Sequence, residues 1–183
     1  MRNLILIFCL FFISSCGEVE CPAFPEELMT WVDSKTNDIL AYKSFNDTLS
    51  HIVINNYKSE GYSFRKNCDC ECSASAGFET QQNKNGYKII GNCSYFNDNY
   101  INVSYKFQSN ETDELFEFRY DFANNQILDE VDIIDYELNG VVLSNVGMIE
   151  KANNKKVIKV YFTSKKGLIA FVDKNSIEWK LIE

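Results

Sequence analysis

The chain has 183 residues, 45% of them hydrophobic and 24% charged, and its formal net charge is −8 at pH 7. This length is sufficient for one domain with a buried core. An acidic protein is repelled by phosphate backbones and by anionic lipid surfaces, so the charge argues against nucleic acid as a partner.

The N-terminus has the order of a secretory signal. Arg2 is followed by an unbroken apolar run over residues 4–13 and then by the small residues Ser14 and Ser15. The run has about half of the ~20 residues that a transmembrane helix needs, so we do not expect a permanent span. The tetrapeptide at 13–16, Ile-Ser-Ser-Cys, resembles the bacterial lipobox. The resemblance implies cleavage before Cys16 and attachment of acyl chains, such as palmitate, through its sulfur. The alternative is a plain signal peptide with a chance cysteine.

This interpretation divides the chain into three segments. Residues 1–15 form the signal peptide, residues 16–36 a lipidated tether with one short helical turn, and residues 37–183 a single all-β domain. One acyl chain holds a protein to a bilayer only marginally, but each buried CH₂ adds about 0.8 kcal/mol, so a terminus with several chains stays anchored. We therefore expect the protein in the cell envelope, at the outer membrane, on either its periplasmic or its surface face.

Beyond the tether the sequence is that of short strands. Residues 39–42 and 49–55 are rich in β-branched and aromatic side chains, and Asn46-Asp47 between them is a turn signal. The clearest alternation of apolar and polar residues covers 101–108, and a second one covers 116–122. A strict period of two is typical of strands with one buried and one solvated face, as in antiparallel sheets.

The last third of the chain continues with further strands. The candidates are 131–138, 141–143, 157–162, 168–172 and 177–182. The Asn139-Gly140 pair predicts a tight hairpin because both residues tolerate positive φ. With about ten short strands and no long amphipathic helix, the sequence predicts an antiparallel β-sandwich or an open barrel that ends in a three-stranded meander.

The C-terminal strands also carry a resemblance. Residues 160–171 (VYFTSKKGLIAF), followed by 178–181 (EWKL), look like the closing strands of many small lipoproteins of Bacteroidota, whose function is uncharacterised. Residues 138–146 are similar to the strand that precedes them in those proteins. The resemblance covers only this end of the chain and the signal. Its motifs are turns and core positions, so it implies no catalytic residue.

Cysteines are the next candidates for chemistry. Besides Cys16, five remain after the signal, namely Cys21, Cys68, Cys70, Cys72 and Cys93. Export places them in an oxidising compartment, where disulfides are the default state. On a strand, the three at 68, 70 and 72 share one face, so each needs a partner elsewhere, and those at 21 and 93 are available. The alternative is a zinc or copper site built from the cysteines at 68, 70, 72 and 93, although the Cys-x-x-Cys spacing usual for zinc is missing.

Few other residues suggest catalysis. His51 is the sole histidine, and no Gly-x-Ser-x-Gly motif accompanies it, so we expect an exposed or edge-strand side chain rather than a triad member. The acidic run at 129–137 lacks the glycine and the spacing of a calcium-binding EF-hand loop. Tyr95, Phe96 and Tyr100 flank an expected loop and are the best exposed candidates for a carbohydrate-binding platform.

These patterns favour a non-enzymatic lipoprotein that needs no cofactor and no metal. It would reach the membrane through its N-terminal lipid and would bind an envelope protein or give structural support. One alternative is a lipocalin-like barrel that binds a small ligand in an apolar cavity. Another is a hydrolase that uses carboxylates far apart in sequence. A large cavity favours the first alternative, and a cleft with two facing carboxylates favours the second.

Overall fold

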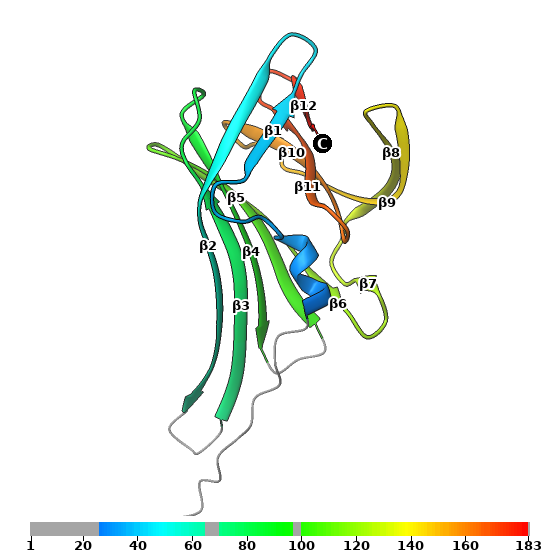
Figure 1. The fold of residues 1–183 in the computed structure, drawn as a ribbon. Coiled ribbons are helices and arrows are strands. Elements are labelled where there is room, and N and C mark those ends of the chain that lie inside the picture. Colours follow the sequence, from blue (N-terminus) through cyan, green and yellow to red (C-terminus); the bar gives the residue numbers. More distant parts are fainter. Residues whose placement is uncertain (1–25, 65–69, 97–99, 183) are drawn as a thin grey trace, which may run out of the picture.

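The computed structural model describes residues 26–64, 70–96 and 100–182. Within these ranges, twelve strands form one antiparallel sheet in the order β7-β6-β5-β4-β3-β2-β1-β12-β11-β10-β9-β8. The sheet curls into a half-barrel (Figure 1). The predicted all-β class is therefore confirmed, and of the two predicted architectures the open barrel is the one observed.

The strands form two meanders, in which consecutive strands pair. The first meander comprises β1 (Ile39–Lys43), β2 (Thr48–Phe64), β3 (Cys70–Thr80), β4 (Tyr87–Phe96), β5 (Tyr100–Ser109), β6 (Asp113–Asp121) and β7 (Gln126–Ile127). The second comprises β8 (Asp132–Leu138), β9 (Val141–Glu150), β10 (Val157–Thr163), β11 (Gly167–Asp173) and β12 (Glu178–Leu181). The predicted three-stranded meander at the C-terminus is β10–β12.

Pairing between β1 and β12 joins the two meanders, with Tyr42 opposite Leu181. As a result β7 and β8 form the two edges of the sheet, although they follow each other in the chain. The line along which β6 and β7 face β8, β9 and β10 without strand pairing is called the seam below. Among the described strands, pairing is otherwise continuous from β7 to β8.

The main core fills the inside of the half-barrel. On β5 the apolar side chains from Ile101 to Phe107 are buried there and alternate with half-exposed polar residues, as the period of two predicts. β6 repeats the pattern from Phe116 to Tyr120. Phe107 contacts Phe171 of β11, with 5.2 Å between ring centroids. Aromatic packing therefore connects the two meanders across the interior.

The structure explains why glycine occurs at two positions of the second meander. Gly147 in β9 pairs with Phe162 of β10, and a Cβ at this glycine would overlap the phenyl ring. The missing side chain therefore lets the ring lie over the β9 backbone. In the β8–β9 turn, Asn139 and Gly140 have φ angles of 51° and 83°, which confirms the hairpin predicted from this pair.

The β8–β9 hairpin packs against the outer face of β10 and β11 (Figure 1). Tyr136 stacks on Tyr161 with 4.5 Å between ring centroids, and Asn139 Nδ2 donates to the Leu181 carbonyl at 2.9 Å. A register shift in β8, with Asn145 at a φ of 59° on β9, bends the hairpin. The bend aims the first part of β9 along the seam.

The N-terminal segment begins with a 3-10 helix, η1 (Glu26–Trp31), which confirms the predicted helical turn. Trp31 and Val32 enter the main core, and Tyr105 Oη donates to the Trp31 carbonyl at 2.8 Å. Across the described ranges, no helix combines the length and the apolar character needed to cross a bilayer. The predicted signal peptide at 1–15 and the first part of the tether lie outside the described residues.

Candidate functional site

At one end of the seam, side chains hold its two sides together. The carboxylate of Glu114 on β6 accepts hydrogen bonds from three consecutive backbone N–H groups, those of residues 155–157, at 2.6, 2.7 and 2.7 Å. Lys151 Nζ donates to the Leu115 carbonyl at 2.7 Å. Hydrogen bonds with an ionised partner are shorter and stronger than neutral ones. These contacts therefore connect β6 to the β9–β10 turn in place of strand pairing.

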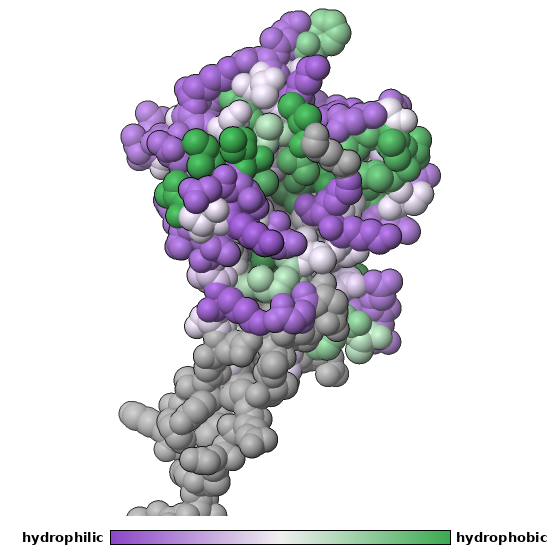
Figure 2. Space-filling view, viewed as in Figure 1, coloured by the Kyte–Doolittle hydropathy of each residue, from purple (hydrophilic) through white to green (hydrophobic). Residues whose placement is uncertain are grey.

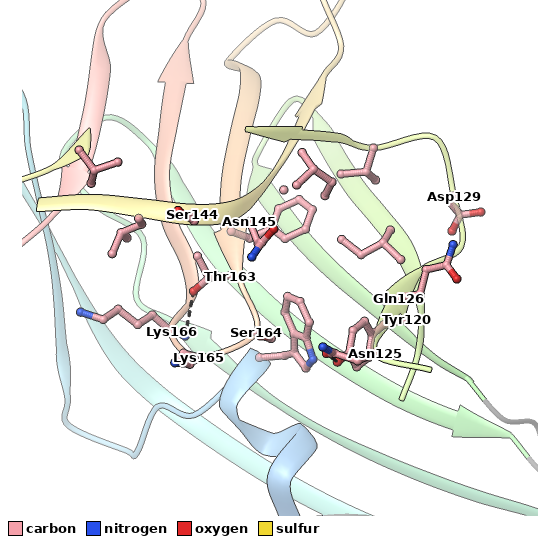
Figure 3. Close-up of a pocket in the computed structure, with 18 residues that line it drawn as sticks. Tyr120, Asn125, Gln126, Asp129, Ser144, Asn145, Thr163, Ser164, Lys165 and Lys166 are labelled. Atoms are coloured by element: carbon pink, nitrogen blue, oxygen red, sulfur yellow. Dashed lines mark hydrogen bonds between the residues drawn. The ribbon is translucent and has the colours of Figure 1, made fainter. Parts of the chain in front are cut away.

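At the other end, the seam opens into a cavity of about 750 Å³. The cavity lies between β6–β7 and the strands β9 and β10, and Trp31 of η1 reaches it from inside the half-barrel. Figure 3 shows side chains from these elements converging on it. Its lining combines aromatic rings, aliphatic side chains and polar groups.

Aromatic rings form the floor of the cavity. Trp31 packs edge-on against Phe118 and Tyr120, with 5.3 and 5.2 Å between ring centroids. Phe162 stacks on Phe118 at 4.2 Å. Because the rings come from η1, β6 and β10 and fix one another, the floor is pre-formed, as in most small-molecule sites.

Aliphatic side chains form one wall and are partly exposed to solvent. Ile133 of β8 is 52% exposed and Val142 of β9 is 65% exposed, and both line the cavity together with Leu143. Figure 2 shows apolar residues gathered over the β8–β9 hairpin. Burying apolar surface is favourable by about 25 cal/mol per Å². A molecule that covered this wall would therefore be stabilised by burial alone.

The turn between β10 and β11 places two cationic residues at one end of the cavity. Lys165 and Lys166 are exposed and line it (Figure 3). The turn is held in place because Thr30 Oγ1, in η1, donates to the Ser164 carbonyl. Within the turn, the Lys166 N–H donates to Thr163 Oγ1 at 3.2 Å. η1 therefore fixes both the aromatic floor and the cationic turn.

Asp129 lies at the other side of the cavity from the two lysines (Figure 3). Its carboxylate is paired with Arg119: Nη2 lies 2.6 Å from Oδ1, and the Arg119 backbone N–H donates to Oδ2 at 2.5 Å. Hydrogen bonds from the guanidinium lower the pKa of Asp129. The carboxylate is therefore ionised at neutral pH, and Arg119 compensates its charge.

The described lining has few of the side chains that commonly carry out acid–base or nucleophilic chemistry. Asp129 is its single carboxylate, and it contains neither histidine nor cysteine. Burial raises the pKa of Tyr120, and its hydroxyl donates to Asn125 Oδ1, so this phenol stays protonated at neutral pH. Hydrolysis of a glycoside needs two facing carboxylates, and a nucleophile needs an adjacent base. Two facing carboxylates are not present among the described lining residues.

The structure corrects the expectation for His51, which was an exposed or edge-strand side chain. His51 is 0% exposed, on the inner face of the long strand β2. The rings of Tyr42 and Tyr87 lie 6.0 and 5.6 Å away, and Nε2 lies 3.0 Å from Asn83 Nδ2. Alternation along β2 turns this position inward together with Leu49, and desolvation lowers its pKa to about 4. The neutral ring is a core residue outside the cavity.

Cys93 lies in β4 and faces the core. It is a free thiol, although the sequence made it one of five candidates for disulfides. Its strand partners are Ala76 and Val103, so its neighbours across the sheet are apolar and carry no sulfur. Burial raises the pKa of the Cys93 thiol to about 12, so the thiol is unreactive at neutral pH.

The remaining cysteine predictions lie outside the part of the chain that the structure describes. This holds for Cys16, Cys21, Cys68 and for the side chains of Cys70 and Cys72. Disulfides among them stay a prediction. Among the described residues, no group of three or more His, Cys, Asp or Glu side chains could hold a metal ion.

The predicted aromatic platform is not part of the cavity either. Tyr95 is half-buried and packs against Phe122, with 6.2 Å between centroids. Tyr100 lies 5.7 Å from the Arg119 guanidinium. The side chain of Phe96 lies outside the described residues. The two described tyrosines therefore already have aromatic or cationic neighbours.

The residues of the cavity were missed in the sequence analysis. Trp31, Tyr120, Val142 and Lys165 are separated by long stretches of sequence and meet only because the sheet curls. The one local signal was the Ser-Lys-Lys-Gly sequence at 164–167, which is a turn signal and says nothing of a ligand.

The chain matches no family model, no curated protein and no solved structure. The resemblance to small lipoproteins of Bacteroidota stays a prediction. The seam cavity is the feature from which a function can be inferred.

Proposed function

We propose that this protein is a lipid-anchored, non-enzymatic lipoprotein of the cell envelope that binds a small, largely apolar molecule in the seam cavity. The observation that carries the proposal is the cavity. Its volume of about 750 Å³ falls within the ~300–1,000 Å³ of typical ligand sites. Such sites combine apolar walls with a few polar groups that fix orientation. Here Trp31 and Phe162 supply the floor, Val142 part of a wall, and Lys165 a polar end.

Two competing functions are less well supported. A purely structural role gives no reason for the solvent exposure of Ile133 and Val142 beside a rigid aromatic floor. A carboxylate-dependent hydrolase requires a second acidic group facing Asp129, and the described lining supplies none. Ligand binding accounts for both the exposed wall and the pre-formed floor.

The proposed site also differs from that of a lipocalin-like barrel. In such a barrel the ligand occupies the interior, but here aromatic side chains such as Tyr105, Phe107 and Phe171 fill it. The ligand would instead enter from the side, where β6–β7 and β9 do not pair. The open edge of the sheet is thus the functional feature of this proposal.

Filling the cavity tests the proposal. The full chain, reconstituted in lipid nanodiscs, is titrated with N-phenylnaphthylamine, a neutral fluorophore that accepts excitation energy from tryptophan. We expect saturable, tryptophan-sensitised emission, because Trp31 lines the cavity. Val142→Phe places a ring in the cavity and should weaken binding by at least about fivefold, which is roughly 1 kcal/mol.

The neighbouring valine provides the matched control. Val141 is 60% exposed on the same strand but does not line the cavity, so Val141→Phe should bind the fluorophore as the unmodified chain does. The proposal fails if the unmodified chain shows no saturable signal, or if the two phenylalanine variants weaken binding equally.

A further inference from the structure

We infer that the ligand of the seam cavity is an amphiphile with a single acyl chain and an anionic head group, oriented with its head at the β10–β11 turn. This inference rests on the proposed function and adds the chemical class and the orientation of the ligand. It is carried by the distribution of charge along the cavity and by the position of the cavity relative to the predicted anchor.

The cationic end is the first observation. Lys165 lines the cavity, is exposed and forms no ion pair with any side chain that the structure describes. Lys166 lies beside it on the same turn (Figure 3). In a chain with a net charge of −8, the Lys165 cation at the end of the cavity forms a local site for an anion. The hydroxyl of Ser144, on the same side in Figure 3, adds a hydrogen-bond donor.

The other charged group of the lining does not oppose an anionic ligand. Asp129 is on the far side of the cavity from the lysines (Figure 3). Its carboxylate is bound by Arg119 through Nη2 at 2.6 Å and Nε at 3.0 Å, so its charge is compensated locally. Within the described lining, the uncompensated charge is therefore that of Lys165 at the β10–β11 turn, and it is positive.

The lining between the two charged ends includes aromatic and aliphatic side chains beside polar ones such as Asn145. Trp31, Tyr120 and Phe162 form the floor, and Ile133 and Val142 form an exposed wall. A flexible hydrocarbon chain can cover this mixed aromatic and aliphatic surface, and the burial of its CH₂ groups is favourable. A small anion such as free phosphate would leave the wall exposed, so an acyl chain matches the surface better.

The length of the predicted tether would keep the cavity close enough to the bilayer to receive such a molecule. Glu26, where η1 begins, lies ten positions after Cys16. An extended chain spans at most about 3.5 Å per residue, so lipid attachment at Cys16 would hold η1 within about 35 Å of the bilayer surface. Because Trp31 at the end of η1 lines the cavity, the ligand can be an amphiphile that leaves the membrane.

Photo-crosslinking in membranes tests the head group. Vesicles of phosphatidylcholine that contain the full chain receive one of three diazirine probes with the same hydrocarbon chain: palmitic acid, cetyl phosphate or cetyl alcohol. Crosslinked peptides are identified by mass spectrometry. We expect the two anionic probes to label cavity peptides that contain Trp31 or Val142, and Lys165→Glu to reduce this labelling by at least about fivefold. Labelling by only one anion identifies a carboxylate or a phosphate as the head.

A lysine at the opposite end of β11 provides the matched control. Lys174 is exposed and does not line the cavity, so Lys174→Glu changes the net charge equally and should leave labelling unchanged. Equal labelling by cetyl alcohol, or equal loss in both lysine variants, would overturn the inference while leaving ligand binding intact. If none of the probes labels the cavity but N-phenylnaphthylamine binds, the acyl-chain assignment is wrong. If that fluorophore also fails to bind, the proposed function fails as well.

Discussion

At the scale of single residues, the buried histidine makes stability depend on pH. Desolvation lowers the pKa of His51 from 6.5 to about 4 in the folded chain. Below pH 6.5 the unfolded chain therefore binds a proton that the folded chain resists, so stability falls as the pH drops from 6.5 to 4 and this contribution levels off below. At about 1.4 kcal/mol per pKa unit, the loss is about 3 kcal/mol.

Denaturant unfolding of the full chain in nonionic detergent at pH 7 and pH 4.5 measures this effect. His51→Gln removes the titrating group but keeps polar atoms that can face Asn83 and Thr80. Carboxylates contribute to the pH dependence of both proteins, so the relevant quantity is the difference between their slopes. We expect the variant to lose about 2 kcal/mol less than the unmodified chain over this range, because pH 4.5 still lies above the folded-state pKa. Identical slopes would show that His51 is protonated without cost in the folded chain.

At the scale of elements, Glu114 is the group that closes one end of the seam. Its carboxylate accepts three backbone N–H groups from residues 155–157 and is 5% exposed. Glu114→Gln replaces one acceptor oxygen with an N–H₂ group that faces these donors. Losing charged hydrogen bonds and leaving a buried donor unpaired should cost about 2–4 kcal/mol of unfolding free energy.

Hydrogen exchange gives the local readout of this change. Peptides that cover the β9–β10 turn should exchange faster in Glu114→Gln than in the unmodified chain, because their N–H groups lose an acceptor. Glu117 lies on the same strand but is exposed, so Glu117→Gln should alter neither stability nor exchange. A Glu114→Gln chain with unchanged exchange in this turn would mean that the seam is held by other contacts.

Element by element, the accuracy of the sequence analysis followed the strength of the alternation. The strand predicted at 101–108 is observed as β5 (Tyr100–Ser109). This prediction succeeded because the large apolar side chains of the strand alternate strictly with polar ones. β3 and β4 were missed. β3 is rich in Ala, Ser and Gly, which have no strong strand preference. These small residues are needed there because larger ones face them, as Tyr57 faces Gly77 across β2 and β3.

At the scale of the whole molecule, the long-range strand pairing that curls the sheet limited what the sequence could predict. Local pattern indicates strands and hairpins, and it led to the all-β class. It does not indicate that β1 pairs with β12, which brings Tyr42 next to Leu181, because that pairing depends on how far the whole sheet curls. The cavity is a product of the same closure, since Trp31, Tyr120 and Val142 come from three separate parts of the chain. The site was therefore out of reach of any local motif.

The proposed placement of the whole molecule in the envelope depends on one sulfur, that of Cys16. Only a thiolate can accept the lipid, so Cys16→Ser should abolish incorporation of labelled palmitate and lower the mass of the protein's N-terminal peptide accordingly. Cys9, inside the apolar run, is the control: Cys9→Ser should be lipidated normally. Palmitate labelling and mass are the readouts because an uncleaved signal could by itself keep the serine variant at the membrane. If Cys16→Ser still carried palmitate, the anchor would lie elsewhere, and the distance argument that brings a membrane amphiphile to the cavity would no longer hold.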